Sequence, residues 1–143
     1  MKRRLLKNCN WSLLMLMASS LFSGVFLETT GGIESGSNYR FAVYFHIVTS
    51  LLLTVGSIWH IMLHFGSLKN SFTRLLSVKR QNKWLATFLV LSAITGAIAT
   101  AHWATSGHSS IGGFHGKIAL IGGIIMVCHV IKRLKFYTNR ITN

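Results

Sequence analysis

Four apolar stretches of helix length divide this chain, and they limit its fold more than any other feature. They cover residues 11–27, 41–65, 84–104 and 115–132. Each is close to the ~20 residues that an α-helix needs to cross a bilayer. Helix is the state that suits such stretches, because backbone amides in lipid must bond within their own segment. The sequence therefore predicts an all-α, integral membrane four-helix bundle that forms a single domain over residues 1–143.

The composition also favours lipid as the solvent. Half of the residues are hydrophobic, none is proline, and 12% are charged, whereas about a quarter are charged in a typical soluble domain. The net charge of +13 resembles that of a nucleic-acid-binding protein. However, the basic residues lie between and beyond the apolar stretches, which is a pattern of membrane topology. We therefore expect contact with a lipid bilayer and no nucleic-acid partner.

The basic residues also predict an orientation. Thirteen of the 15 lysines and arginines lie in the two terminal tails and in the connection after the second stretch. The positive-inside rule places these segments in the cytoplasm. We expect a multi-pass protein of the bacterial inner membrane with both termini cytoplasmic. The connection 67–83 mixes cations with apolar residues, which predicts a short interfacial helix.

The first stretch has a second interpretation. Basic residues followed by an apolar run are also typical of a signal peptide. Phe26-Leu27-Glu28 is a poor cleavage context, because no small-x-small site precedes it cleanly. We therefore favour a retained first helix.

Two matched pairs of histidines lie within the second and fourth stretches. His46 precedes His60 by 14 residues, and His115 precedes His129 by the same number. Fourteen helical residues rise roughly 21 Å and return to within ~40° of the same direction. Each helix thus presents two imidazoles on one face. The charge pattern places His46 and His115 near the outer surface, and His60 and His129 toward the cytoplasm.

Ionisable residues inside a membrane are costly and indicate function, and a neutral imidazole offers a nitrogen lone pair to a metal. The pattern predicts two bis-histidine b haems. His46 and His115 are expected on the outer haem iron, and His60 and His129 on the inner one. No CxxCH motif is present, so both haems are expected to be bound non-covalently.

Three glycines are secondary candidates for the haem pockets. Gly122 lies midway between the two histidines of the fourth stretch, and Gly24 and Gly96 lie in the first and third. A missing side chain leaves room for a macrocycle edge. Close packing of helices in lipid explains each glycine equally well.

The remaining histidines have weaker assignments. His64 follows His60 by one turn, where it would bond a haem propionate, border an inner quinone pocket, or simply lie at the interface. His102 and His108 are expected at the outer interface, with a propionate or proton path as the alternative. Cys9 and Cys128 fall in different helices or at different depths, so no disulfide is expected between them.

The second stretch resembles a helix found in small prokaryotic four-helix membrane cytochromes b, many of which are filed as a domain of unknown function. Its pattern is a histidine, thirteen residues and HI-x-x-H, which runs here from His46 to His64. His115-Gly-Lys through Cys128-His129 supplies the partner pair. The same plan is similar to the core of respiratory cytochrome b. The resemblance implies the ligand assignment given above and a respiratory-chain role, although the chain lacks the quinone-loop motifs of full cytochrome b.

The expected function is electron transfer across the bilayer, as a component of a larger oxidoreductase rather than a stand-alone catalyst. A redox protein or a quinone is the expected partner. One alternative is a membrane protein that binds or transports transition metals through its histidines. Another is a haem-bearing anchor or sensor. The electron donor and acceptor, the direction of transfer, the haem potentials and the oligomeric state are left open by the sequence.

Overall fold

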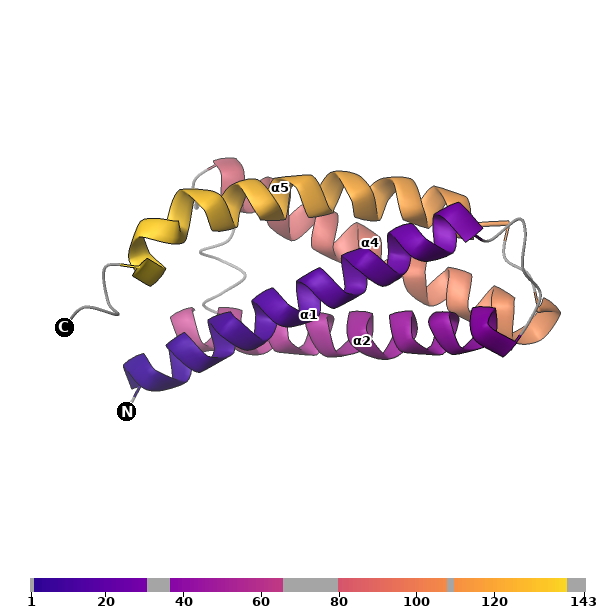
Figure 1. The fold of residues 1–143 in the computed structure, drawn as a ribbon. Helices are drawn as coiled ribbons and strands as arrows, with labels where there is room; N and C mark the ends of the chain where they lie inside the picture. The colour runs from indigo at the N-terminus through magenta and orange to yellow at the C-terminus, as the bar shows by residue number, and fades with distance from the viewer. Residues whose placement is uncertain (1, 31–36, 66–79, 108–109, 139–143) are drawn as a thin grey trace.

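The computed structural model forms a bundle of four helices within its described residues, which are 2–30, 37–65, 80–107 and 110–138. Side chains are described for 5–6, 8–30, 37–63, 83–107 and 110–132. The helices are α1 (Lys2–Thr30), α2 (Ser37–Phe65), α4 (Arg80–Ser106) and α5 (Gly112–Thr138), shown in Figure 1. This part of the chain contains no strand. The predicted all-α four-helix architecture is confirmed.

The helices differ from their predicted bounds, because all four begin earlier and three end later. The largest difference is in α1, which begins at Lys2 rather than at residue 11. An apolar stretch marks only the part of a helix that lies in lipid. Lysine and arginine are themselves good helix formers, so the helix continues into the basic flanks. The predicted interfacial helix over 67–83 lies outside the described residues, except for 80–83, which belong to α4.

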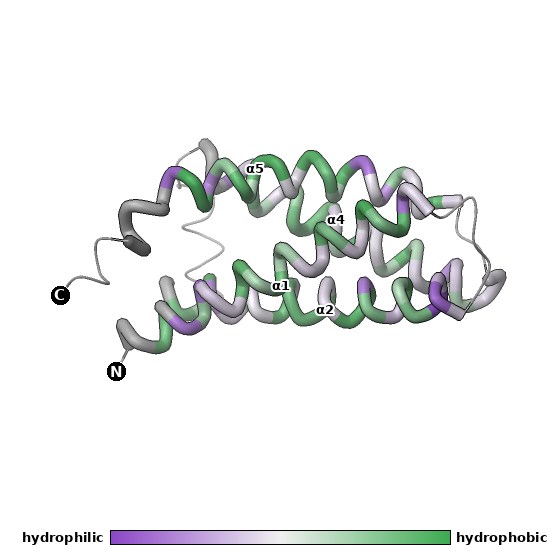
Figure 2. Tube along the Cα trace, in the orientation of Figure 1, coloured by the Kyte–Doolittle hydropathy of each residue, from purple (hydrophilic) through white to green (hydrophobic). Residues whose placement is uncertain are grey.

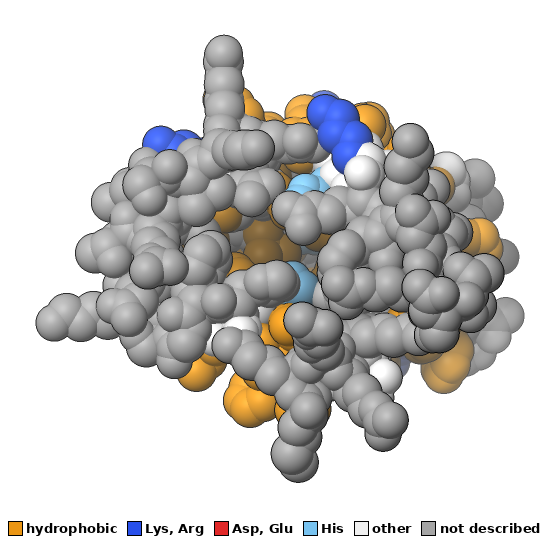
Figure 3. All heavy atoms as spheres, turned by 90° about the vertical axis from the view of Figure 1, so that its left-hand side faces the viewer, with side chains coloured by type: hydrophobic (Ala, Val, Ile, Leu, Met, Phe, Trp, Pro, Cys, Tyr) orange, Lys and Arg blue, Asp and Glu red, His pale blue; other side chains and the backbone are white. Residues whose placement is uncertain are grey.

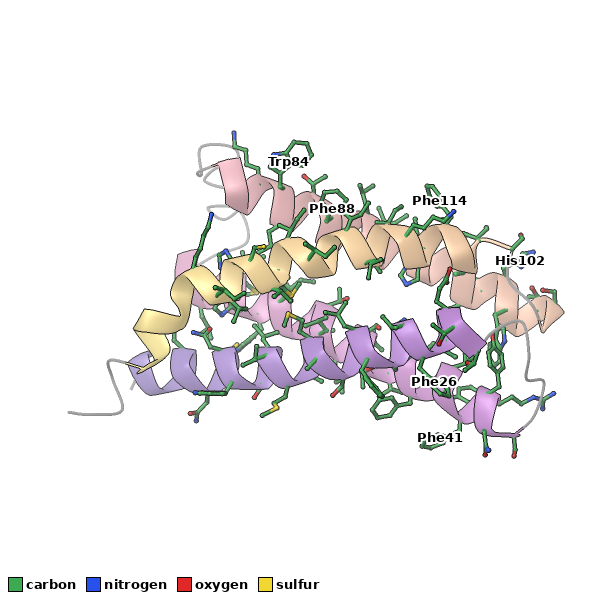
Figure 4. All side chains as sticks on the ribbon, turned by 45° about the horizontal axis from the view of Figure 1, so that its top comes forward. Phe26, Phe41, Trp84, Phe88, His102 and Phe114 are labelled. Atoms are coloured by element: carbon green, nitrogen blue, oxygen red, sulfur yellow. The ribbon has the colours of Figure 1, made fainter. Side chains whose placement is uncertain are left out.

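Each helix contains a segment long and apolar enough to cross a membrane. These segments are Asn8–Thr30, Ser37–Leu63, Lys83–Ser106 and Gly112–Lys132. Figure 2 shows hydrophobic residues along most of the length of every helix. Large aromatic side chains point away from the bundle, among them Phe41, Trp84 and Phe114 (Figure 4). Four such helices with an apolar outer surface are the architecture of a multi-pass membrane protein and are compatible with contact with lipid.

Two antiparallel hairpins make up the bundle. The closest packing is of α1 along α2 and of α4 along α5, while α1–α5 and α2–α4 contacts join the hairpins. Consequently α2 and α5 lie diagonally across the bundle, without close backbone contact between their described residues. Figure 1 shows that these two helices run in the same direction and that both chain ends lie at one end of the bundle.

The interior of the bundle is lined mainly by small and hydroxyl-bearing residues. Within the described part, the buried polar residues are Ser20, Ser23 and Thr49, and no large side chain is fully buried. Ser20 of α1 bonds Ser50 of α2 across the first hairpin, with 2.7 Å between the hydroxyl oxygens. Large apolar side chains cover the outside, while Met17 and Val43 are buried inside together with the hydroxyl-bearing residues.

Candidate functional site: paired imidazoles between diagonal helices

His46 of α2 and His115 of α5 face each other across the bundle. Their ring centroids are 6.1 Å apart and the ring planes are inclined by 66°. Metal–imidazole bonds are about 2 Å long, so two rings that share one metal ion on opposite sides have centroids roughly 6 Å apart. The pair therefore has the separation that a single bis-histidine metal centre requires.

The His46 ring is held in one tautomer by α1. Its Nδ1 lies 3.2 Å from the carbonyl oxygen of Ser20 and 3.0 Å from the hydroxyl oxygen of Ser23. The Ser23 hydroxyl donates its own proton to that same carbonyl, at 3.1 Å. Since a carbonyl only accepts hydrogen bonds, Nδ1 carries the hydrogen and donates it to both oxygens. The lone pair is then on Nε2, the usual arrangement for a histidine that ligates a metal.

The His115 ring is held in the same way by α4. Its Nδ1 lies 3.1 Å from the hydroxyl oxygen of Thr95, and the backbone of Ser92 is a further hydrogen-bond partner. The Thr95 hydroxyl donates to the Leu91 carbonyl at 2.8 Å, so its oxygen accepts the imidazole hydrogen. Both rings of the pair thus keep Nε2 available to a metal.

Glycines allow the supporting helices to reach the rings. A Cβ atom on Gly24 would lie 3.1 Å from Cε1 of His46, and one on Gly96 would lie 3.0 Å from Cε1 of His115. Both distances are shorter than an ordinary van der Waals contact, so a larger residue at either position would require the neighbouring ring to shift. These two glycines therefore lie against the imidazoles. At Gly122 a Cβ would lie 3.2 Å from Cβ of Phe88, which supports the close-packing interpretation of that residue.

The segments of α1 and α4 that hold the two imidazole rings share one sequence pattern, which was not recognised from the sequence alone. It reads Ser20-x-x-Ser23-Gly24 in α1 and Ser92-x-x-Thr95-Gly96 in α4. In each, the serine supplies a carbonyl, the next hydroxyl residue supplies an oxygen, and the glycine leaves space. The repeated S-x-x-[ST]-G pattern was the available signal for Ser23 and Thr95. It makes the two hairpins equivalent around the outer histidine pair.

The predicted inner residues, His60 and His129, are half-buried in α2 and α5. They lie 14 residues nearer the end of the bundle that carries the termini, or roughly 21 Å along each helix. Nδ1 of His60 is buried. Seen from that end, histidine side chains are visible near the middle of the bundle, close to hydrophobic ones (Figure 3).

The other predicted residues lie apart from the outer pair or outside the described part. His102 is exposed near the end of α4, with its Nδ1 3.5 Å from the Ser106 hydroxyl oxygen. This position agrees with an interfacial histidine. The side chain of His64 and the whole of His108 lie outside the described residues. Cys9 and Cys128 are free cysteines, as predicted.

Comparison with protein-family models, curated proteins and solved structures gives no match to this chain. The donor set fits a haem, because a haem iron takes two axial protein ligands and imidazole is a common one.

Proposed function

We propose that this chain is a membrane b-type cytochrome that carries electrons across the bilayer through two non-covalently bound haems. The observation that supports this most directly is the outer pair. His46 and His115 oppose each other at a metal-sharing distance, and both have Nδ1 engaged and Nε2 available. A bound haem supplies one-electron redox chemistry at its iron.

The histidines determine which chemistry is favoured. His46 and His115 would both ligate the iron of a bound haem, which would leave no position for a substrate and would favour electron transfer. In this proposal His46 and His115 hold the outer haem, while His60 and His129 hold the inner one. The rise of roughly 21 Å between the two levels of each helix places one centre near each membrane surface. Haems held at both levels would supply one-electron redox chemistry toward each side of the apolar layer.

The membrane location and the partners of the chain are also part of this proposal. We infer a bacterial inner membrane location with cytoplasmic termini, from the basic residues of the tails. The electron partners are a redox protein or a quinone, and the chain acts as part of a larger oxidoreductase.

Visible spectroscopy of the protein purified in detergent tests this function. We expect low-spin b-type bands on reduction with dithionite and two haems per chain. His46→Ala or His115→Ala should remove one haem, and His60→Ala or His129→Ala the other. His102→Ala is the matched control, because this exposed histidine lies outside the proposed sites, and it should retain both haems.

Two results would contradict the proposal. The first is a full haem content in any of the four ligand variants. The second is a colourless protein; zinc binding by such a protein would support the metal-binding or transport alternative instead.

A further inference from the structure

A cleft of about 330 Å³ lies between α1 and α2, at the end of the bundle opposite the termini. Figure 4 shows Phe26 of α1 and Phe41 of α2 near each other at that end. Aromatic rings and a carboxamide suit a flat apolar ring that carries a polar group on its edge. We call this space the aromatic cleft, and it is lined by Phe22, Ser23, Phe26, Asn38, Phe41 and Ala42.

The aromatic cleft reaches the residue that holds the outer histidine. Ser23 lines the cleft and is only 5% exposed. Its hydroxyl oxygen lies 3.0 Å from Nδ1 of His46. A ring bound in the cleft would therefore contact a side chain that is itself hydrogen-bonded to His46. The cleft is thus placed beside the outer site of the proposed function.

A second space, the apolar groove, adjoins the aromatic cleft and shares Phe22 with it. It has a volume of about 470 Å³ and lies between α1 and α5. Its other lining residues are Leu21 and Val25 of α1 and residues of α5 between Leu120 and Cys128. That part of α5 is roughly 12 Å long and belongs to the candidate membrane span Gly112–Lys132. The groove therefore suits a hydrocarbon chain that runs from the cleft into the apolar layer.

The lining of the two spaces distinguishes between membrane amphiphiles. Among the described residues, no charged side chain lines either space. A phospholipid headgroup is recognised by basic side chains that bond its phosphate. A neutral ring with carbonyl groups needs only apolar contacts and a neutral donor, which the amide of Asn38 supplies. A quinone combines such a ring with a hydrocarbon tail, so the lining favours a quinone over a phospholipid.

We propose that the aromatic cleft binds the ring of a lipid-soluble quinone and that the apolar groove takes its tail. In this site the phenylalanines contact the ring, and the side-chain amide of Asn38 donates to a ring carbonyl oxygen. This inference rests on the proposed function and deepens it. It selects a quinone as the electron partner and places that partner at the level of His46.

Calorimetric titration of the purified protein with decylubiquinone in detergent tests the cleft. Asn38→Ala and Phe41→Ala should each raise the Kd about 10-fold, because they remove the amide donor and a ring contact. Both side chains are exposed, so the bundle should keep its fold, which circular dichroism checks. Phe114→Ala is the matched control and should leave the Kd unchanged, because this exposed phenylalanine lines neither space.

The groove has a separate test. Leu120→Trp fills part of the groove and should weaken the binding of decylubiquinone. The same variant should bind ubiquinone without a tail as well as the wild-type protein does. Equal weakening for both compounds would contradict the placement of the tail.

Three results would overturn the inference. They are an unchanged Kd in both cleft variants, equally tight binding of decanol, which has the chain but no ring, and displacement of the quinone by phospholipid at equal concentration. The haem content is measured separately. A wild-type protein with two haems and no quinone binding refutes this inference and leaves the proposed function intact. A protein that binds the quinone without haem supports the cleft and refutes the proposed function.

Discussion

At the scale of single residues, the outer site depends on the state of one nitrogen in each imidazole. Ser20 and Ser92 offer carbonyls that only accept, so the hydrogen must be on Nδ1. The hydroxyls of Ser23 and Thr95 add a second acceptor because their own protons go to backbone carbonyls. Four residues that need not touch a metal thus determine which nitrogen is offered to one.

Removing one of these hydroxyls should weaken the outer haem without displacing the inner one. Ser23→Ala or Thr95→Ala takes away one acceptor and leaves the carbonyl, so we expect about 10-fold weaker outer haem retention. Haem titration of the purified variants measures this. Thr105→Ala is the control, because that exposed hydroxyl only donates to its own helix. Equal retention in all three variants would show that the hydroxyls do not support the ligands.

A second prediction concerns the space beside the ring. Gly24→Leu places a side chain where a Cβ alone lies 3.1 Å from the His46 ring, so the imidazole must move. We expect loss of the outer haem and retention of the inner one, measured as haem per chain. Gly113→Leu is the control, because a Cβ there meets nothing within 4 Å. Two haems in Gly24→Leu would contradict the assigned contact.

At the scale of helices, close approach depends on small residues rather than on a large apolar core. Gly123 of α5 is buried against α1, where a Cβ would lie 2.5 Å from Cδ2 of Leu21. Gly56 plays the same part between α2 and α1. Because lipid is as apolar as the side chains, helix association in membranes depends on such close contacts.

Filling the space at Gly123 should therefore weaken the packing of α5 against α1, which joins the two hairpins. Gly123→Leu is expected to destabilise the bundle by about 1–3 kcal/mol, the usual cost of overpacking. Thermal unfolding in detergent, followed by circular dichroism, measures the effect as a lower Tm. Ala97→Leu makes a similar change on the exposed face of α4 and should leave the Tm nearly unchanged. Equal losses in both variants would rule out a specific role for Gly123.

At the scale of the whole molecule, the packing of the two hairpins places α2 and α5, which run in the same direction, diagonally opposite each other in the bundle. Each helix runs antiparallel to the next one along the chain, so only diagonal partners run the same way (Figure 1). His46 and His115 therefore meet at one level, because each lies near the start of its helix. The same topology brings both termini to one end (Figure 1).

This topology gives a prediction about orientation. Reporter fusions at the N-terminus and at the C-terminus should both report a cytoplasmic location, because the basic tails favour that side. A fusion in the connection 107–111 should report the opposite side. Opposite locations for the two termini would contradict the described bundle, whereas two external termini would contradict only the inferred orientation.

The sequence by itself determined the all-α class, the four spans and the 14-residue spacing of the histidines. These are properties of single helices, fixed by hydropathy and by 3.6 residues per turn. Only the tertiary structure decided that His46 meets His115, that Ser23 and Thr95 hold their rings, and that Gly24 and Gly96 make room for them. Those contacts depend on the register and rotation of one helix against another, which are determined by close packing and by hydrogen bonds between helices.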